Sequence, residues 1–483
     1  MTRPLFLPEN SRTVLMTANG VDELPEKRPQ FVASFVGTLT AVGVGMTCSW
    51  SSSAIPVFQR EIGVTTSQEA WIGSILALGG FAGAFPTGPL AHWIGRKRTL
   101  QLLMLPLIVS WFLLAYFYHN LSIVYLGRFM AGLSMGGVSV AAPLYVAELA
   151  HISIRGTLGT FFQVQITVGL LMTYVFGDLL PDLRSLSLVC AVVPLVFLLS
   201  SAFIPESPVY LCEISQMHKA QNSLIWFRGR DYDVEDELLK ITDDIKEARL
   251  NEAGLSDLVS CKATRKALII SLGLMAFQQL SGINAVLFYT NSIFEKSGAA
   301  LSPGHCSILV GTVQVVATLA STALIDKSGR KILLILSASI MCISLAALGL
   351  YTHAGVTSYT WVPLVSLALF IIAFSLGFGP IPWMLMSELF PPAVKGVASS
   401  IAAASNWLLA FVVTNQFNGA KEALGLGPAF LIFSLICGVA TGFVILLVPE
   451  TKGRSVEQVR SLLVGGGGFE EAKETTEKMT TNV

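Results

Sequence analysis

The chain has 483 residues, of which 53% are hydrophobic and only 13% are charged, and its mean hydropathy is +0.66. Soluble proteins average about 25% charged residues, so this composition excludes an ordinary soluble fold and favours a bundle of helices in a lipid bilayer. The 31 basic and 31 acidic residues cancel, which argues against a nucleic-acid partner.

A helix that spans a bilayer needs about 20 mostly apolar residues, and twelve stretches of the sequence meet this requirement. After a polar N-terminal tail, residues 1–32, the first half covers 33–204. Its predicted spans are 33–55, 71–91, 99–118, 122–146, 157–178 and 184–204. A charged linker, 205–264, is expected to contain one or two short amphipathic helices.

The second half covers residues 265–448. Its predicted spans are 266–290, 305–325, 332–352, 360–387, 396–418 and 427–448. The tail that follows, 449–483, is polar and contains a run of glycines, so we expect it to be disordered. The sequence therefore predicts an all-α membrane protein of twelve transmembrane helices in two halves.

Basic residues are distributed unequally between alternate loops. If the N-terminus is cytoplasmic, the outer loops carry only Arg60, Arg184, Lys296 and Lys421. The short inner loops carry the basic clusters 96–98 and 327–331. The positive-inside rule then places both termini and the linker in the cytoplasm, and the cell membrane is the expected location.

The two halves share motifs. Gly-Arg-Lys at 95–97 recurs at 329–331, and Pro-Glu-Ser at 205–207 is matched by Pro-Glu-Thr at 449–451. A glutamate stands seven residues before a base in each half, as Glu148 before Arg155 and Glu388 before Lys395. Two parallel repeats with a binding site at their interface are a transporter architecture.

The repeated charges lie near the predicted cytoplasmic ends of spans. We expect them to form ion pairs that hold the halves together when the binding site faces outward. These predicted gate residues are Arg96, Glu148, Arg155, Glu206, Asp326, Arg330, Glu388, Lys395 and Glu450. Ordinary topology-setting bases with solvated carboxylates are the alternative, but they would not require the same glutamate-to-base spacing in both halves.

Uncharged hydrogen-bonding side chains lie inside several spans. Amides offer donors and acceptors that match hydroxyl groups, and an indole offers a flat face for a sugar ring. The predicted sugar-binding residues are Gln163, Gln278, Gln279, Asn284, Gln314, Trp383 and Asn406. Hydrogen bonding between helices explains any one amide equally well, whereas the cluster from 278 to 284 favours a site.

The amide cluster also predicts a broken helix. Gln279 and Asn284 would lie about 140° apart on a straight helix, so both can face one cavity only if the helix bends, and Gly282 between them permits this. Glycines and prolines at 377–382 suggest a second break in span ten.

The spans contain almost no acidic residues away from their ends, and the polar stretch 47–53 of span one is uncharged. Ion-coupled carriers normally use an intramembrane carboxylate, so passive transport is favoured. The sequence contains no phosphate-binding glycine loop, catalytic triad or metal-spaced histidine pair, and its seven cysteines are scattered. We therefore expect no enzymatic activity, cofactor, metal site or ATP-driven pumping.

Together these features resemble the sugar porter family of the major facilitator superfamily, over about residues 35–456. The segments that carry the resemblance are 127–129, 143–148, 155–160, 205–208, 278–284, 379–383 and 449–454. Segments 377–383 and 386–391 are similar to the facilitated trehalose transporters of insects and the hexose facilitators of vertebrates. The resemblance implies alternating access and sugar contacts at the seven residues given above. It also implies that Ser51 stands where proton-coupled members carry an acid.

The sequence departs from the family pattern at four positions. His92 replaces a carboxylate or amide, and Val209 replaces an arginine, so we expect the first half of the gate to be weaker. Ser375 replaces a carboxylate of span ten, and Gln314 replaces a commoner asparagine of the pocket.

The substrate is therefore expected to be trehalose or a hexose such as glucose. A proton-coupled symporter and a non-transporting sugar receptor on the same fold are the alternatives, disfavoured by Ser51 and by the short C-terminal tail. Asn120-Leu121-Ser122, in a predicted outer loop, is a candidate glycosylation site.

Overall fold

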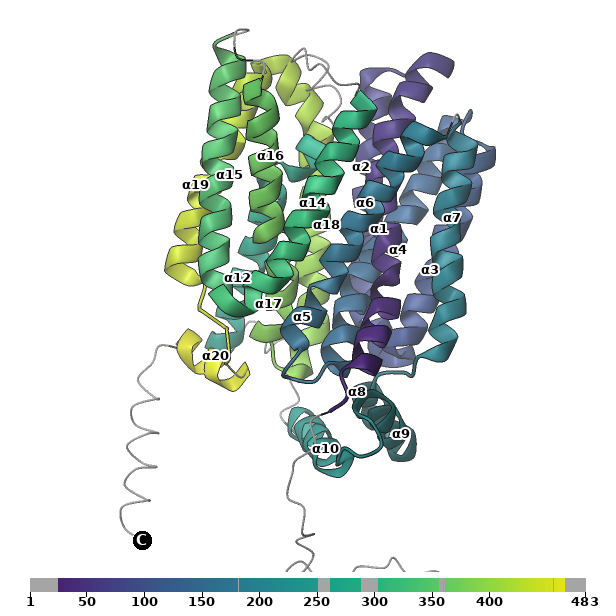
Figure 1. Cartoon of the computed structure of the whole chain (residues 1–483), viewed down its shortest axis with the longest axis vertical. Coiled ribbons are helices and arrows are strands. Elements are labelled where there is room, and N and C mark those ends of the chain that lie inside the picture. The colour runs from purple at the N-terminus through teal and green to yellow at the C-terminus, as the bar shows by residue number, and fades with distance from the viewer. Residues whose placement is uncertain are drawn as a thin grey trace, which may run out of the picture.

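The computed structural model describes residues 25–180, 182–250, 261–287, 303–355, 359, 361–454 and 456–464. Within these ranges, twelve helices are long and apolar enough to cross a membrane, as the composition predicted. Figure 1 shows them as two bundles side by side, with the second half in green and yellow and the first in purple and blue.

The first half contains six spans, and a break divides its fifth span. Its helices are α1 (Arg28–Glu61), α2 (Thr66–Ile94), α3 (Arg96–Tyr116), α4 (Leu121–Leu149), α5 (Arg155–Gly159) with α6 (Phe161–Leu179), and α7 (Leu183–Ser200) with the 3-10 turn η2 (Ser201–Phe203). The break at Thr160 was not predicted.

In the second half, α12 (Lys262–Leu280) continues as a helix to residue 287 after a turn at 281–282. The other helices of this half are α14 (Pro303–Ser328), α15 (Arg330–His353), α16 (Trp361–Leu376), α17 (Ile381–Leu389), α18 (Pro392–Leu424) and α19 (Leu426–Leu447). Residues 288–290 of the predicted seventh span lie outside the described part of the chain.

The linker contains three described helices rather than one or two, namely α8 (Pro208–Glu213), α9 (Met217–Arg228) and α10 (Val234–Leu250). They form a small core of their own, since apolar side chains of α10 such as Leu238 and Ile241 pack against a buried cluster that α8 and α9 provide. Arg228 joins this unit to the bundle, donating to the carbonyl of Leu149 at the end of α4 (2.8 Å).

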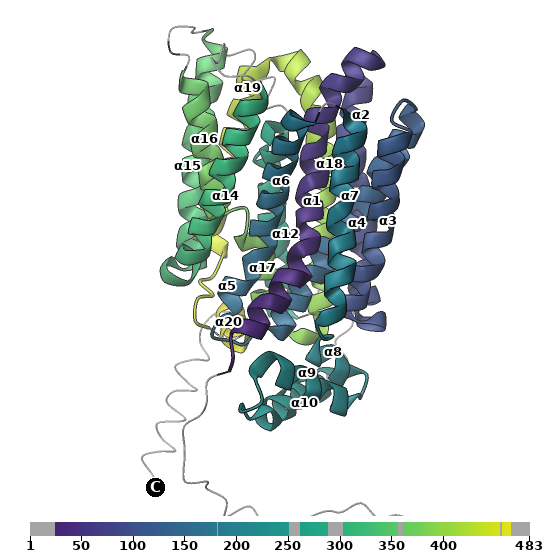
Figure 2. The same cartoon turned by 45° about the vertical axis from the view of Figure 1, so that its right-hand side comes forward.

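The tail is also more ordered than predicted, because α20 (Val456–Val464) packs on α12 and α17 through the buried side chains of Val459 and Leu463. Figures 1 and 2 show α20, the linker helices and the start of α1 at the same end of the bundle. We call this the linker end.

Glycines set the closest helix contacts in the first half. A Cβ on Gly83 of α2 would overlap the carbonyl of Leu133 on α4, and a Cβ on Gly136 of α4 would overlap the carbonyl of Gly80 on α2. Small residues let two helix backbones approach closely in this way. This contact fixes α2, which forms part of the first half's interface with the second half.

The two halves meet along α2 and α18 and along α6 and α14. A Cβ on Gly80 would lie 2.8 Å from the ring of Trp407, so the indole rests on bare backbone at mid-bundle. Toward the linker end, the N–H of Gly88 donates to Oγ of Ser400 (3.0 Å). Near the opposite end, Asn415 donates to Ser74 (3.1 Å).

Both predicted helix breaks are confirmed. Gly282 has φ +82°, and α12 ends two residues before it. The second break is a turn at 377–380, between α16 and α17. Glycine tolerates positive φ without steric cost, which explains why the seventh span can turn at residue 282.

The contact between α2 and α4 leads to a test. Alanine at Gly83 should destabilise the bundle by about 1–3 kcal/mol, because the new methyl group has no space beside Leu133. Alanine at Gly73, also in α2 but with open space around it, should be neutral or stabilising by about 0.5–1 kcal/mol. Thermal unfolding in detergent measures both variants, and equal melting temperatures for the two would contradict the proposed packing.

Candidate functional site

A cavity of about 90 Å³ lies between the two halves at mid-bundle. All seven predicted sugar-binding residues line it, as do Trp407, Phe374 and Cys48. Only Gln163 among the seven comes from the first half, where its neighbours are mostly apolar, such as Val44 and Leu170. The hydrogen-bonding wall of the cavity is therefore built almost entirely by the second half.

The amides of that wall form a continuous network across the helix break. Nδ2 of Asn284 donates to Oε1 of Gln279 (2.6 Å), and Nε2 of Gln279 donates to Oδ1 of Asn406 (2.9 Å). Nδ2 of Asn406 in turn donates to Oε1 of Gln278 (2.9 Å). The turn at Gly282 brings Asn284 to the same side as Gln279, as the break predicts.

Gln278 ties the two broken spans together. Its Nε2 donates to the carbonyls of Phe378 (2.6 Å) and Gly379 (3.1 Å), which lie in the turn between α16 and α17. Carbonyls at a helix break lack their usual intrahelical partners and must be satisfied by other groups inside a membrane protein. The amides thus hold the breaks in place as well as lining the cavity.

Several cavity groups keep unused hydrogen-bonding capacity. Oε1 of Gln314 and Nε1 of Trp407 are buried without a partner among the described residues, and Gln163 makes no hydrogen bond there. Buried polar atoms are normally paired, so these groups are suited to the hydroxyls of a bound ligand. Trp407, which follows Asn406 in α18, is not among the seven predicted sugar-binding residues but lines the same cavity.

The Trp383 ring forms the side of the cavity toward the linker end. It packs at a tilt against Phe162 of the first half, with ring centroids 6.0 Å apart. By contrast, Gln165 is not a cavity residue. Its amide donates to Phe35 and Thr38 of α1, so it joins two helices of the first half.

A fully buried arginine, Arg128, lies near the cavity without a carboxylate partner in the described chain. It donates to the carbonyls of Ile72 and Thr47 and to Oγ of Ser51 (2.5 Å). Its guanidinium also lies over the ring of Trp50. The partners of the guanidinium charge are two carbonyls, a hydroxyl and an aromatic face. No acid that could take up a proton is among these partners.

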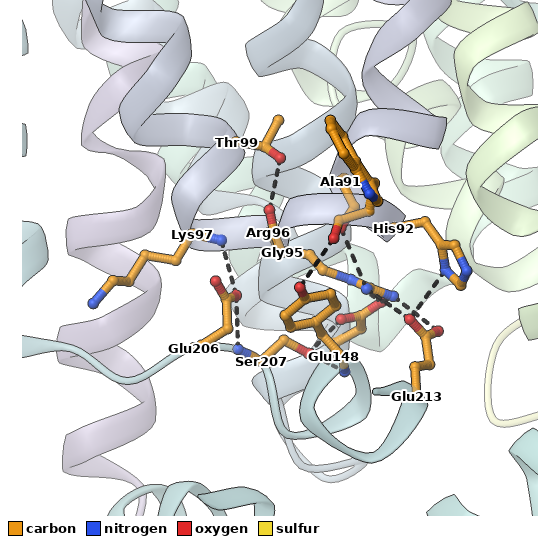
Figure 3. Close-up of polar contacts among 12 residues, drawn as sticks. Ala91, His92, Gly95, Arg96, Lys97, Thr99, Glu148, Glu206, Ser207 and Glu213 are labelled. Carbon is orange, nitrogen blue, oxygen red and sulfur yellow. Dashed lines mark hydrogen bonds and ion pairs between the residues drawn. The ribbon is translucent and has the colours of Figure 1, made fainter. Parts of the chain in front are cut away.

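At the linker end, Arg96 of α3 connects two helices of the first half with a helix of the linker (Figure 3). It forms ion pairs with Glu148 of α4 (2.8 Å) and with Glu213 of α8 (2.8 Å). Ser207 donates to the second oxygen of Glu148. Glu206 accepts from the backbone N–H of Lys97 (2.9 Å), capping the start of α3.

The second half contains the same arrangement. Arg330 pairs with Glu388 (3.0 Å), and Thr451 donates to the other oxygen of Glu388 (2.5 Å). Glu450 accepts from the N–H groups of Arg330 (3.0 Å) and Lys331 (3.1 Å), capping α15. The sequence repeat therefore corresponds to a repeated hydrogen-bond network, in which each half is joined by the segment that directly follows its sixth span.

The predicted gate residues do not form a ring of ion pairs in the described part of the chain, where those pairs stay within one half or reach the linker. Arg155 of the first half and Glu388 of the second line one small cavity beside Trp383. Lys395 lies half-buried on α18. The side chain of Asp326 lies outside the described residues.

The linker supplies a carboxylate that sequence reasoning missed. Glu213 binds Arg96 and also accepts from Nδ1 of His92 (3.1 Å), as Figure 3 shows. Burial alone would raise the pKa of Glu213, but hydrogen bonds from His92 and Arg96 outweigh it and lower the pKa to about 2. His92 itself takes part in this network, so Glu213 ties α8 to α2 as well as to α3.

Asn120 is exposed, and its Oδ1 accepts from the N–H of Ser122 (3.0 Å), capping α4. Its glycosylation stays a prediction.

The chain is similar to known proteins both in sequence and in fold. The family described as "Sugar (and other) transporter" matches residues 25–463. The chain is 38% identical over 482 residues to the facilitated trehalose transporter Tret1 of Anopheles gambiae, covering 95% of the chain and 60% of that relative. It is 35% identical to Tret1 of Bombyx mori, covering 90% of the chain and 87% of the relative. The chain thus spans about 60% of the length of the Anopheles relative and 59% of that of Aedes aegypti.

Among solved structures, the fold is similar to that of the major facilitator proton:xylose symporter XylE bound to 6-bromo-6-deoxy-D-glucose. The TM-score is 0.81 at 24% identity, over 90% of the chain and 99% of XylE. An inward-open conformation of XylE from E. coli gives a TM-score of 0.72. This likeness establishes the fold, with its two six-helix halves.

The tie at Glu213 predicts a pH-dependent hold on the linker. Because its pKa is lowered in the folded protein, the carboxylate adds stability above about pH 4.5 that is lost as the pH falls toward 2, on the order of 3 kcal/mol at most. Glu213→Gln should therefore speed limited proteolysis of the linker at neutral pH.

The difference between wild type and this variant should shrink as the pH approaches 2. Asp243→Asn, which changes an exposed carboxylate of the same linker, is the matched control and should have little effect at any pH. A Glu213→Gln effect that stays constant from pH 7 to pH 3 would show that ionisation of this group does not hold the linker.

Proposed function

Because the chain belongs to the sugar (and other) transporter family, we propose that it carries a sugar across a membrane down its gradient by alternating access. The substrate is trehalose or a hexose such as glucose. The observation that carries this proposal is the cavity between the halves, lined by uncharged amides and indoles. Neutral groups with both donors and acceptors suit a polyhydroxylated, uncharged solute.

The residues that line the cavity differ in how much hydrogen-bonding capacity they have left, and we assign them different roles on that basis. Gln278 and Asn406 use most of their hydrogen-bonding capacity within the protein, so they position the wall. Gln163, Gln314 and Trp407 have capacity left and are the groups proposed to meet sugar hydroxyls first. Trp383 offers its ring face to the sugar and separates it from the linker end.

Passive transport is supported by the site of Arg128. A proton-coupled carrier needs an acid that titrates within the membrane, and the hydrogen-bond partner of Arg128 at this position is the hydroxyl of Ser51. The insect relatives are named as facilitated transporters. XylE is named as a proton symporter, but at 24% identity it supports the fold alone.

We place the linker end in the cytoplasm and the protein in the cell membrane. The first turns of α3 and α15, at that end, carry the basic residues 96–98 and 330–331, which favour the cytoplasmic side. The gate residues then lie at the inner mouth. Arg155 and Glu388 line one small cavity from opposite halves, so opening inward would separate them while leaving the ion pairs within each half intact.

Substitution of Gln279 tests the binding wall. Gln279→Ala removes the central link between Asn284 and Asn406, and we expect it to abolish most sugar flux into proteoliposomes while expression stays normal. Gln221→Ala, an amide of the linker, is the control and should transport like wild type. Normal flux in Gln279→Ala would refute the proposed site.

Energetic coupling is tested in the same proteoliposomes. Labelled trehalose, glucose and fructose are offered separately, with and without an imposed pH difference. A facilitator should bring at least one sugar to equal concentrations on both sides and no further, whatever the pH difference. Accumulation above equilibrium would identify a symporter, and absence of flux for every sugar would favour a receptor.

A further inference from the structure

A second cavity, of about 380 Å³, lies at the linker end outside the transport pathway. Its walls come from three places, which are the first turn of α3, the segment after α7, and helices α8 and α9. None of the residues lining it lines the central cavity. It therefore lies at the junction of the linker with the first half.

Two bases at this cavity have no acid partner in the described chain. Arg98 and Lys219 are both exposed, and the ion pairs of the described residues include neither. The cavity also contains Glu206, but its carboxylate already accepts from three backbone N–H groups, those of Lys97, Arg98 and Ser207. The charged side chains of the cavity that have no partner among the described residues are therefore both positive.

The remainder of the cavity is suited to a ring. Trp226 is 37% exposed and borders the cavity together with Tyr210, Leu211 and Ile214. Asn222, also at the cavity, offers an amide that hydroxyl groups can bind. An arginine and a lysine bind phosphate through charge-assisted hydrogen bonds, and an indole face can stack on the apolar face of a polyol ring.

We propose that this cavity binds a phosphorylated polyol ring. Arg98 and Lys219 would hold the phosphate, and Trp226 and Asn222 would hold the ring. Such a group is found on an inositol phospholipid and on a free sugar phosphate. Phe203, 81% exposed at the end of the sixth span, lies two residues before the cavity wall begins at Pro205, so a lipid headgroup could reach the cavity as readily as a soluble ligand.

A ligand here would bridge α3 to the linker helices α8 and α9. It would therefore act beside the tie that Glu213 makes between α8 and α2, and hold the linker more firmly on the first half. Binding itself does not depend on the proposed sugar transport and is measured separately from flux.

The test uses the full-length protein in detergent and in nanodiscs. Glucose 6-phosphate and inositol 1-phosphate are the soluble probes, and nanodiscs with and without phosphatidylinositol 4-phosphate supply the lipid. The variant is Arg98→Gln with Lys219→Gln. Its matched control is Arg230→Gln with Lys240→Gln, which removes two exposed bases of the linker that do not line the cavity.

We expect at least one probe to bind the wild type, with affinity falling at least tenfold in the cavity variant and less than twofold in the control. Binding of the soluble probes alone would identify a sugar phosphate, and binding of the lipid alone would identify a headgroup. Trp226→Phe should remove the change in tryptophan fluorescence that the bound probe produces.

Two outcomes would overturn the proposal. One is that no probe binds the wild type, and the other is that both double variants lose affinity equally, which would indicate non-specific attraction to linker charge. Sugar flux of the cavity variant without ligand should match wild type, which shows that the variant is folded. A failure of transport in the wild type would bear on the proposed function and leave the binding result unaffected.

Discussion

The hydrogen bond between Asn284 and Gln279, across the turn at Gly282, is the contact on which the central cavity depends. A broken helix inside a bilayer exposes backbone groups that lipid cannot satisfy. Here the bond between Asn284 and Gln279 links the two sides of the turn, and Gln278 donates to the backbone carbonyls of the second break. The amides therefore serve both purposes considered from the sequence. The hydrogen bonds that hold the broken helices together also place the amides around the cavity.

The two halves contain the same arrangement of glutamates and an arginine at the linker end, but the arrangement has different partners in each half. In each, a glutamate caps the helix that follows the basic loop, and an arginine of that helix pairs with a second glutamate. In the first half the arginine also reaches a further carboxylate, Glu213 on the linker. The first half is thus mechanically joined to the linker, and the second half shares no such ion pair in the residues that the structure describes.

The sequence was sufficient where the signal was local. Runs of apolar residues predicted all twelve spans, and the spacing of Gln279 and Asn284 predicted the break at Gly282. It failed where the outcome depends on contacts between distant segments. In the sequence, Glu213 cannot be told from the solvated acids of the linker. Its role depends on α8 lying close to His92 of α2 and Arg96 of α3. The linker helices are short, and their apolar side chains become a core only when all three meet. Gly159 directly precedes the break at Thr160, but a glycine is common in membrane helices and did not by itself predict a break.

The unequal lining of the central cavity has a consequence for the energetics of the proposed passive transport. Most hydrogen-bonding groups belong to the second half, while the first half contributes mainly apolar wall around Gln163. When the halves rock, a sugar held by the second half would keep the same partners whichever side is open. Its affinity would then differ little between the two faces of the membrane. A carrier of this kind exchanges sugar in both directions with equal ease, and the concentrations on the two sides alone decide the net flow.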